Sequence, residues 1–141
     1  MHRQVVLHVM RLVILAATGT GILLVQGCDT KYPYEEVLRR NSAEMNKKCP
    51  IDVGAGTRLD STSAGPGKRF TYYYTLTRQV LDSIDVKSMN SNLKPMLIGN
   101  LKMNKSLEML RKNKANFYYY FFDRKGRFVL SIPITPEDYR R

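Results

Sequence analysis

The sequence predicts a single small α+β domain in which helices cover one face of an antiparallel sheet. Some segments carry apolar residues at every second position, as half-buried strands do, and others carry them at every third or fourth position, as helices do. The 141-residue chain is 43% hydrophobic and 25% charged, which is typical of globular proteins and excludes collagen-like and wholly disordered chains. We expect the domain in residues 34–141, in the order helix, hairpin, kinked or paired helix, hairpin.

Residues 1–27 have the composition of an export signal. Two arginines and no acid accompany an uncharged apolar run over residues 12–25. This run is shorter than the roughly 20 residues that span a bilayer, but it suits a signal peptide. The run ends in Val25-Gln-Gly-Cys28, which resembles a lipobox, the site at which signal peptidase II cuts before a cysteine that carries diacylglycerol. The resemblance implies a bacterial lipoprotein precursor whose mature chain starts at Cys28.

The lipobox carries further expectations. Removal of Arg3 and Arg11 with the signal leaves 21 Lys and Arg against 12 Asp and Glu, a formal charge of +9. Residues 28–33 would form a lipidated tether, and the acyl lipid on Cys28 is the one non-protein group that we expect. Asp29 resembles the inner-membrane retention signal of enteric bacteria, but the sequence leaves both membranes open. An uncleaved membrane anchor and a buried core helix stay open as alternatives.

The first helix is predicted from Tyr34 to about Lys48. Apolar residues recur there at helical spacing and share one side of the helix: Tyr34, Val37, Leu38, Met45 and Cys49. Pro50 ends the helix, because the residue before a proline is pushed toward extended geometry.

Two hairpins are predicted from alternating apolar residues on either side of a turn. Their strands and turns are residues 57–63, 64–67 and 68–77 for the first, and 116–122, 123–126 and 127–134 for the second. Alternation should turn three sets of large apolar side chains toward the helices: Phe70, Tyr72, Tyr74 and Leu76; Phe117, Tyr119 and Phe121; and Phe128, Leu130, Ile132 and Ile134. The tyrosines between them should be wetter.

The segment between the hairpins returns to helical spacing. Asp85 is a plausible N-cap, and apolar residues follow every four positions: Met89, Leu93, Leu97 and Leu101. Pro95 and Gly99 predict a kink or a break in this helix. A second short helix is predicted over residues 105–112.

Three short motifs stand out in the mature part: Cys49-Pro50, Thr-Arg-Leu-Asp-Ser at residues 57–61, and Tyr-x-Tyr-Thr-Leu at residues 72–76. Together they resemble a group of small, uncharacterised exported bacterial proteins. The resemblance implies export and a shared fold unit. It implies no chemistry, because that group has no established activity.

The mature part lacks several residue types on which enzymes depend. Both histidines, His2 and His8, lie in the signal segment, so cleavage excludes Ser-His-Asp and Cys-His mechanisms and the common His-ligated zinc sites. No metal site is predicted. Cys49 would be a nucleophile only if Lys47 and Lys48 lowered its pKa unaided, and packing as a small apolar residue is the simpler interpretation. We therefore expect that the protein is not an enzyme.

Three tyrosines and one charged pair are the candidate binding residues. Tyr73, Tyr118 and Tyr120 could form an exposed aromatic strip that holds a peptide or a glycan. Aromatic residues interleaved with bases would also suit nucleic acid, but an export signal argues against a nucleic-acid partner. Arg58 and Asp60 lie on the same side of one strand, where a structural ion pair is a simpler interpretation than a catalytic carboxylate.

The sequence thus favours a non-catalytic lipoprotein of the cell envelope, an interaction or structural module anchored through Cys28. Three kinds of partner are expected. The lipid would attach the protein to the membrane, and the +9 charge would attract an anionic lipid surface. The third is an envelope protein or glycan. Two alternatives stay open. One is an inhibitor, immunity or phage-exclusion lipoprotein, and the other is an envelope enzyme that uses carboxylate, Tyr or Cys49 chemistry.

Overall fold

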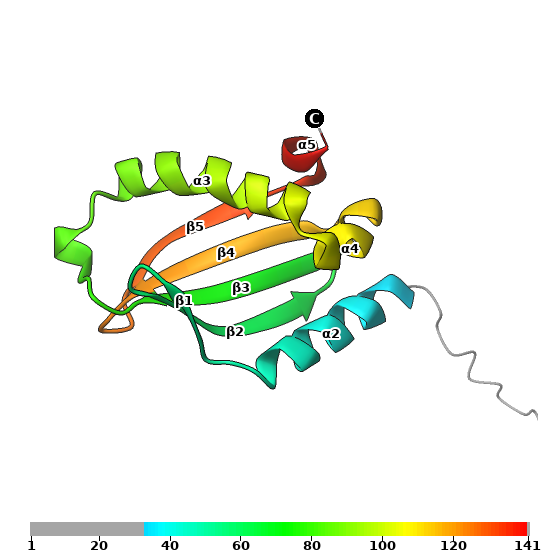
Figure 1. The fold of residues 1–141 in the computed structure, drawn as a ribbon, viewed down its shortest axis with the longest axis horizontal. Coiled ribbons are helices and arrows are strands. Elements are labelled where there is room, and N and C mark those ends of the chain that lie inside the picture. The colour runs from blue at the N-terminus through cyan, green and yellow to red at the C-terminus, as the bar shows by residue number, and fades with distance from the viewer. Residues whose placement is uncertain (1–32, 141) are drawn as a thin grey trace, which may run out of the picture. The chain divides into compact units, whose positions relative to one another are not determined.

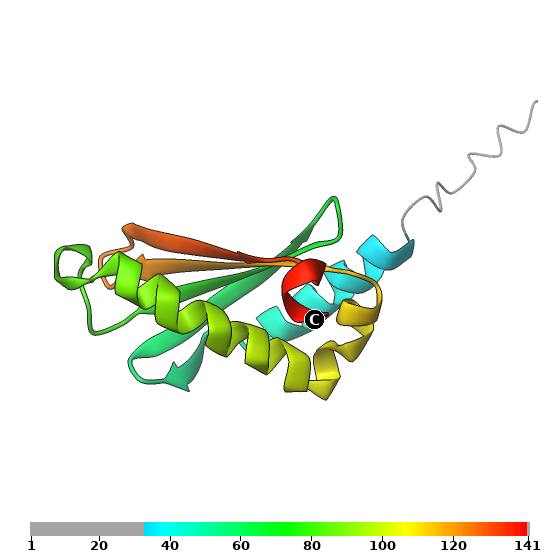
Figure 2. The same cartoon turned by 90° about the horizontal axis from the view of Figure 1, so that it is seen from above.

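Five strands form one sheet that carries its helices on a single face. The computed structural model describes residues 33–140, and within them α2 and α3 lie on the same face of the sheet (Figure 1, Figure 2). The α+β class predicted from the sequence is confirmed. The expected signal segment and Cys28 lie outside the described residues. Among the helices of residues 33–140, none is both long enough and apolar enough to cross a bilayer.

The strands are hydrogen-bonded to one another in chain order. They are β1 (Ile51–Gly54), β2 (Thr57–Gly65), β3 (Arg69–Leu76), β4 (Asn116–Asp123) and β5 (Phe128–Ile134). Three pairings are antiparallel, but β3 and β4 are parallel, so the prediction of an antiparallel sheet is wrong for this pair. The chain between them passes through α3 and α4, and a crossover of that length lets it enter β4 in the direction of β3.

The helix α2 (Pro33–Asn46) confirms the first predicted helix and ends two residues earlier. Its Leu38 is fully buried against the sheet. Near its end, Ser42 and Asn46 hydrogen-bond to Thr62 of β2. These contacts attach the helix to the strand on the side where β1 is short.

The helix α3 (Val86–Met103) runs without interruption through Pro95 and Gly99, so the predicted break is wrong. Proline removes one backbone donor, but Pro95 and Ser91, four residues before it, are both exposed, so water can replace the missing donor. Asp85 caps the helix as predicted and accepts a hydrogen bond from the Ser88 N–H at 3.0 Å. The predicted short second helix is a 3-10 turn, η2 (Lys105–Leu107), followed by α4 (Glu108–Lys112).

The second hairpin forms as predicted, with one difference in strand β5. The pairing of β4 and β5 shifts between Phe121, opposite Leu130, and Phe122, opposite Phe128. This bulge places an extra residue, Val129, in β5 and buries it. Phe128 therefore leaves the helix-covered face and is 51% exposed, so its predicted place in the core is wrong.

Two short elements escape the sequence pattern. β1 shows no alternation of buried and exposed residues, and α5 (Pro136–Tyr139) is a single turn. The Asp138 carboxylate accepts a hydrogen bond from the Thr135 N–H at 2.8 Å and starts this turn. Tyr139 is buried, and its hydroxyl donates to the Ala115 carbonyl at 2.8 Å. α5 thus closes the sheet at the beginning of β4.

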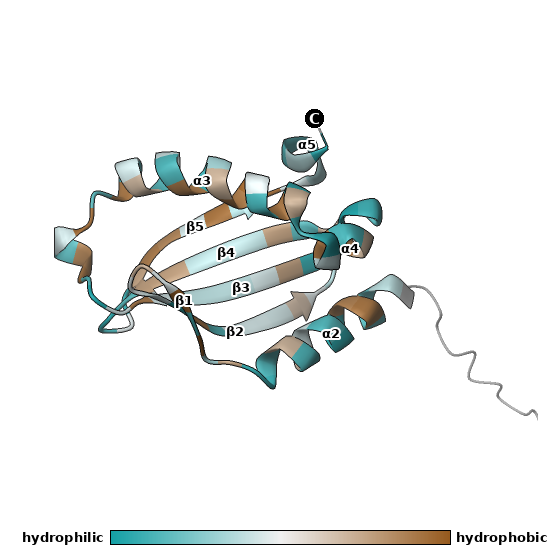
Figure 3. Cartoon of the chain, in the orientation of Figure 1, coloured by the Kyte–Doolittle hydropathy of each residue, from teal (hydrophilic) through white to brown (hydrophobic). Residues whose placement is uncertain are grey.

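The core lies between the sheet and its helices. Hydrophobic residues alternate with hydrophilic ones along α2 and α3 (Figure 3). The largest side chains that are fully buried come from both layers: Phe70, Phe117, Leu38, Leu101, Ile132 and Ile134. The predicted inward faces of β3 and β4 are confirmed, with Tyr74 only half-buried. That partial exposure marks the place where the two helices leave the sheet uncovered.

Candidate functional site

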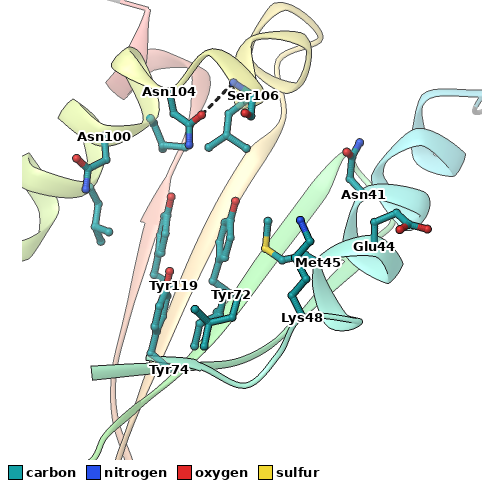
Figure 4. A pocket seen from close by; sticks show the side chains of 15 residues that line it. Asn41, Glu44, Met45, Lys48, Tyr72, Tyr74, Asn100, Asn104, Ser106 and Tyr119 are labelled. Carbon is teal, nitrogen blue, oxygen red and sulfur yellow. Dashed lines mark hydrogen bonds between the residues drawn. The ribbon is translucent and has the colours of Figure 1, made fainter. Parts of the chain in front are cut away.

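A groove opens between α2 and α3 above the central strands of the sheet (Figure 4). Its volume is about 570 Å³, which falls in the range of roughly 300–1,000 Å³ that is typical of ligand sites. Tyr72, Tyr74 and Tyr119 form the floor, Met45 of α2 lines one wall and Leu101 of α3 the other. The groove is therefore assembled from parts of the chain that are far apart in sequence.

The floor is a stack of aromatic rings, and the register of the central strands produces it. Tyr72 lies opposite Tyr119, and Tyr74 opposite Phe121, in the parallel pairing of β3 with β4. The ring centroids of Tyr72 and Tyr119 are 5.0 Å apart with 7° between the planes, and those of Tyr74 and Phe121 are 5.3 Å apart. Such stacked pairs contribute beyond the area that they bury. The two Tyr-Tyr-Tyr runs of the sequence thus meet side by side.

The hydroxyl groups of Tyr72 and Tyr119 point from the sheet into the groove (Figure 4). Within residues 33–140 neither hydroxyl has a hydrogen-bond partner, and neither is sealed from solvent. Burial, and then the neighbouring tyrosines, raises the pKa of both side chains well above the usual value for tyrosine. Burial and then Cys49 raise the pKa of Tyr74 to about 12. All three hydroxyls stay protonated at neutral pH and can donate and accept hydrogen bonds.

Polar side chains form the rim of the groove. Asn100 of α3 and Asn104, the residue directly after this helix, line it, and the Asn104 Oδ1 accepts a hydrogen bond from the Ser106 N–H at 2.9 Å. Lys48 and Glu44 line the side of α2. An apolar floor with hydroxyls, surrounded by amides and charges, suits a ligand that presents apolar groups together with hydrogen-bonding groups.

The structure places the three predicted binding tyrosines on the opposite face of the sheet, away from the groove. Tyr73 stacks on Tyr120 with ring centroids 5.7 Å apart, and its hydroxyl lies 3.1 Å from the hydroxyl of Ser63. The Arg69 guanidinium lies 4.1 Å from the centroid of the Tyr118 ring. The three tyrosines are half-buried, and none of them lines the groove.

Arg58 and Asp60 form the structural ion pair that the sequence favoured. The Arg58 Nε lies 2.5 Å from the Asp60 Oδ1, and the hydroxyl of Thr75 donates to the Asp60 Oδ2 at 2.6 Å. Both carboxylate oxygens are therefore occupied. The hydrogen bond from Thr75 joins β3 to β2, and no oxygen of Asp60 is left without a partner for acid–base chemistry.

Cys49 is half-buried at the end of the connection from α2 to β1. Burial, and then the Asp60 carboxylate, raises the pKa of its thiol, whereas a reactive thiol needs a lowered pKa. Lys47 and Lys48 therefore do not activate it. Within residues 33–140 no three His, Cys, Asp or Glu side chains are grouped closely enough to hold a metal ion.

A family model described as Domain of unknown function (DUF8479) matches residues 33–130. The chain belongs to this family. The match covers the groove and all strands up to the first part of β5. No curated protein matches the chain in sequence.

Solved structures with the same fold come from two bacterial genera, Pseudomonas and Vibrio. A predicted secreted protein of Pseudomonas aeruginosa has a TM-score of 0.62 and 14% identity, over 75% of this chain and 92% of that one. The pilotin EpsS of the Vibrio vulnificus type 2 secretion system has a TM-score of 0.60 and 6% identity, over 76% and 92%. The type II secretion pilotin AspS of Vibrio cholerae has a TM-score of 0.56 and 10% identity, over 74% and 90%. At such identities the likeness shows a shared fold.

The groove of this DUF8479 protein is a feature that sequence reasoning missed. Tyr72 and Tyr119 were expected as core side chains, which describes their rings but not their hydroxyls. The signal that could have located the groove is at the end of α3, where Asn100 and Asn104 lie on either side of the buried Leu101. Polar residues so close to the buried side of a helix indicate that this side meets solvent over part of its length.

Proposed function

We propose that this DUF8479 protein is a non-catalytic lipoprotein of the cell envelope, anchored through a lipid on Cys28, and that its groove binds a segment of a protein partner. The observation that carries the proposal is a pair of tyrosine hydroxyls at the floor of an open groove that have no hydrogen-bond partner within residues 33–140. Because neither hydroxyl is sealed from solvent, water can bond to both, and a ligand with a donor or an acceptor can replace that water. Tyr72 and Tyr119 present two such groups side by side.

The chemistry of the groove favours a polypeptide segment as the ligand. The stacked rings and Met45 offer apolar contact for side chains, while the amides of Asn100 and Asn104 can pair with peptide groups. Lys48 adds one positive charge at the rim. A segment with apolar residues on one side and an acid near one end would satisfy all of these groups.

Three findings support a binding role rather than catalysis. Both oxygens of Asp60 are engaged in the structure, the pKa of Cys49 is raised, and the groove contains tyrosines whose raised pKa keeps them neutral. The fold shared with two pilotins of type II secretion systems and with a predicted secreted protein also supports an exported protein that acts by binding.

Site-specific photo-crosslinking tests the groove. A photoreactive amino acid at Asn104, on the rim, should trap one envelope protein in intact cells. The matched control is Ser131, which is exposed on strand β5 and should trap nothing in common with position 104. Equal yields of the same product at both positions would contradict a partner site in the groove.

The lipid anchor needs a separate test. The intact mass of the membrane-bound protein should equal the chain from Cys28 plus its acyl groups, and Cys28→Ser should abolish labelling with radioactive palmitate. A free thiol at Cys28 in the mature protein would overturn this part of the proposal and leave the groove untouched.

A further inference from the structure

We infer that the end of the domain where α2 begins is a membrane-docking surface that contacts anionic lipid. This inference rests on the proposed lipid at Cys28. The described chain starts at Pro33, only five residues after Cys28, and five extended residues reach about 18 Å at most. A lipid on Cys28 would therefore hold this end of the domain within that distance of the bilayer.

Three segments form this end and contact one another there. The hydroxyl of Tyr34, at the beginning of α2, donates to the Leu110 carbonyl of α4 at 3.1 Å. The Lys68 Nζ of the turn between β2 and β3 lies 5.8 Å from the centroid of the Tyr34 ring. Both views show the start of α2, that turn and α4 gathered at one end of the sheet (Figure 1, Figure 2).

The side chains that this end exposes match a negatively charged lipid surface. Lys68, Lys105, Lys112 and Lys114 are exposed, and Met109 is 60% exposed among the lysines of η2 and α4. Lysine stems lie along apolar material while their ammonium groups reach phosphates. An unbranched methionine can enter the boundary between headgroups and acyl chains.

The acids at this end cancel only part of its charge. Glu108 forms an ion pair with Lys112, with 2.6 Å between Oε1 and Nζ. Glu35 accepts a hydrogen bond from the Gly67 N–H at 3.0 Å, which joins α2 to the turn between β2 and β3 but leaves the negative charge of Glu35 in place. Within residues 33–140, Lys68, Lys105 and Lys114 form no ion pair with an acid, so this end is basic as a whole.

The opposite end of the sheet provides the comparison. It exposes Val53 of β1 (52%) and Phe128 of β5 (51%). It also exposes Arg78, Arg124 and Lys125, whereas its Arg127 is paired with Asp82 and with the buried Asp123. Charge therefore does not separate the two ends, and their distances from Cys28 do. The eight residues of β3 separate the two ends by about 26 Å. For the far end to contact the membrane first, the chain between Cys28 and Pro33 would have to span this distance, which is longer than its reach of about 18 Å.

Depth-dependent quenching on the full, lipidated chain tests the inference. In a Cys49→Ala background, Met109→Cys carries an environment-sensitive fluorophore, and Val53→Cys carries the same label as the matched control. The protein is reconstituted in vesicles of phosphatidylcholine, alone or with 30% phosphatidylglycerol, that contain a nitroxide-labelled lipid. We expect strong quenching at position 109 in the anionic vesicles and little at position 53. Lys105→Gln together with Lys112→Gln should reduce the docked fraction roughly tenfold or more.

The outcomes separate docking from anchoring. Equal quenching at positions 109 and 53 would overturn the docking surface. The same conclusion would follow if Lys105→Gln together with Lys112→Gln left the quenching at position 109 unchanged. Flotation of the protein with pure phosphatidylcholine vesicles reports the lipid anchor alone. Failure to float there, with charge-dependent quenching at position 109 in anionic vesicles, would overturn the anchor and support the docking surface.

Discussion

The side-chain amide of Asn46 in α2 hydrogen-bonds to both backbone groups of Thr62 in β2. The Asn46 Nδ2 donates to the Thr62 carbonyl at 2.9 Å, and its Oδ1 accepts from the Thr62 N–H at 2.7 Å. β1 pairs with β2 only as far as Leu59, so among the described strands none pairs with this edge of β2 beyond that point. Asn46 supplies the donor and the acceptor that such a strand would offer.

Asn46→Ala should therefore destabilise the protein. The change leaves the N–H and the carbonyl of a buried residue without partners, and we expect a loss of about 1–3 kcal/mol in the free energy of unfolding. Urea unfolding followed by circular dichroism measures it. Asn41→Ala on the same helix is the control, because Asn41 is exposed and bonds only within its helix, and it should change stability by less than about 0.5 kcal/mol.

The bulge in β5 predicts that the smaller of two adjacent side chains contributes more to stability. Val129→Ala removes buried methyl groups and should cost about 1–2 kcal/mol. Phe128→Ala should cost less, although Phe128 is much larger, because half of it is exposed. Thermal melts of the two variants check the order, and a greater loss from Phe128→Ala would mean that the side chain belongs to the core after all.

Asp123 should make stability depend on acid. It is fully buried and accepts hydrogen bonds from the N–H groups of Leu81, Lys125 and Arg127 and from the Arg127 side chain. Burial alone would raise its pKa, but these donors outweigh burial and hold the pKa well below its usual range. A lowered pKa in the folded state means that the carboxylate stabilises the fold above about pH 4 and that this stability is lost as the pH falls further.

Asp123→Asn should accordingly melt at a lower temperature than the wild type at pH 7, and the difference should shrink between pH 5 and pH 2. Thermal melts across this range measure it. Asp52→Asn, at an exposed position in β1, controls for the loss of one negative charge. A difference that stays constant from pH 7 to pH 2 would contradict the role given to the Asp123 carboxylate.

The two faces of the sheet can be distinguished by removing single hydroxyl groups. Tyr72→Phe and Tyr119→Phe keep the stacked rings and should each weaken partner binding by roughly two- to tenfold, the equivalent of one hydrogen bond. Tyr118→Phe is the control on the opposite face and should leave binding unchanged. Affinity for the crosslinked partner, measured with folded variants, decides between them. Loss of binding only in Tyr118→Phe would return the site to the face that the sequence suggested.

Cys49 should be dispensable and slow to react. Because the pKa of its thiol is raised, Ellman's reagent at pH 8 should modify it more slowly than it modifies free cysteine. Cys49→Ala should fold and bind like the wild type, since little volume is removed. A variant that folds normally but loses its biological role would instead favour thiol chemistry.

The sequence predicts what depends on local periodicity. The inward faces of β3 and β4 follow from alternation, and Asp85 follows from capping chemistry. The position of Phe128 does not, because one inserted residue reverses every side chain on its side of the bulge. The continuity of α3 through Pro95 depends on which side of the helix meets solvent, and the residue types alone do not state this.

The candidate site was harder to predict, for a related reason. The sequence predicts Tyr72 and Tyr119 as core residues because both occupy inward positions of their strands, and the burial of the two side chains confirms this. Whether a hydroxyl on such a ring meets a partner, a helix or an open groove depends on the spacing of α2 and α3, which is a tertiary property. The sequence therefore predicts Tyr73, Tyr118 and Tyr120 as the binding tyrosines, because alternation along the strands places them on the face opposite the core.

The division of the groove floor between β3 and β4 also determines when the site appears during folding. Each of these strands can pair with its sequence neighbour after a short turn, but their own pairing must close the long connection through α3 and α4. Closing a long connection costs more entropy, and pairings between distant segments slow folding. We expect the two hairpins to form first and the contact of Tyr72 with Tyr119 to form last. A partner that requires both rings would then bind only chains that have completed the fold.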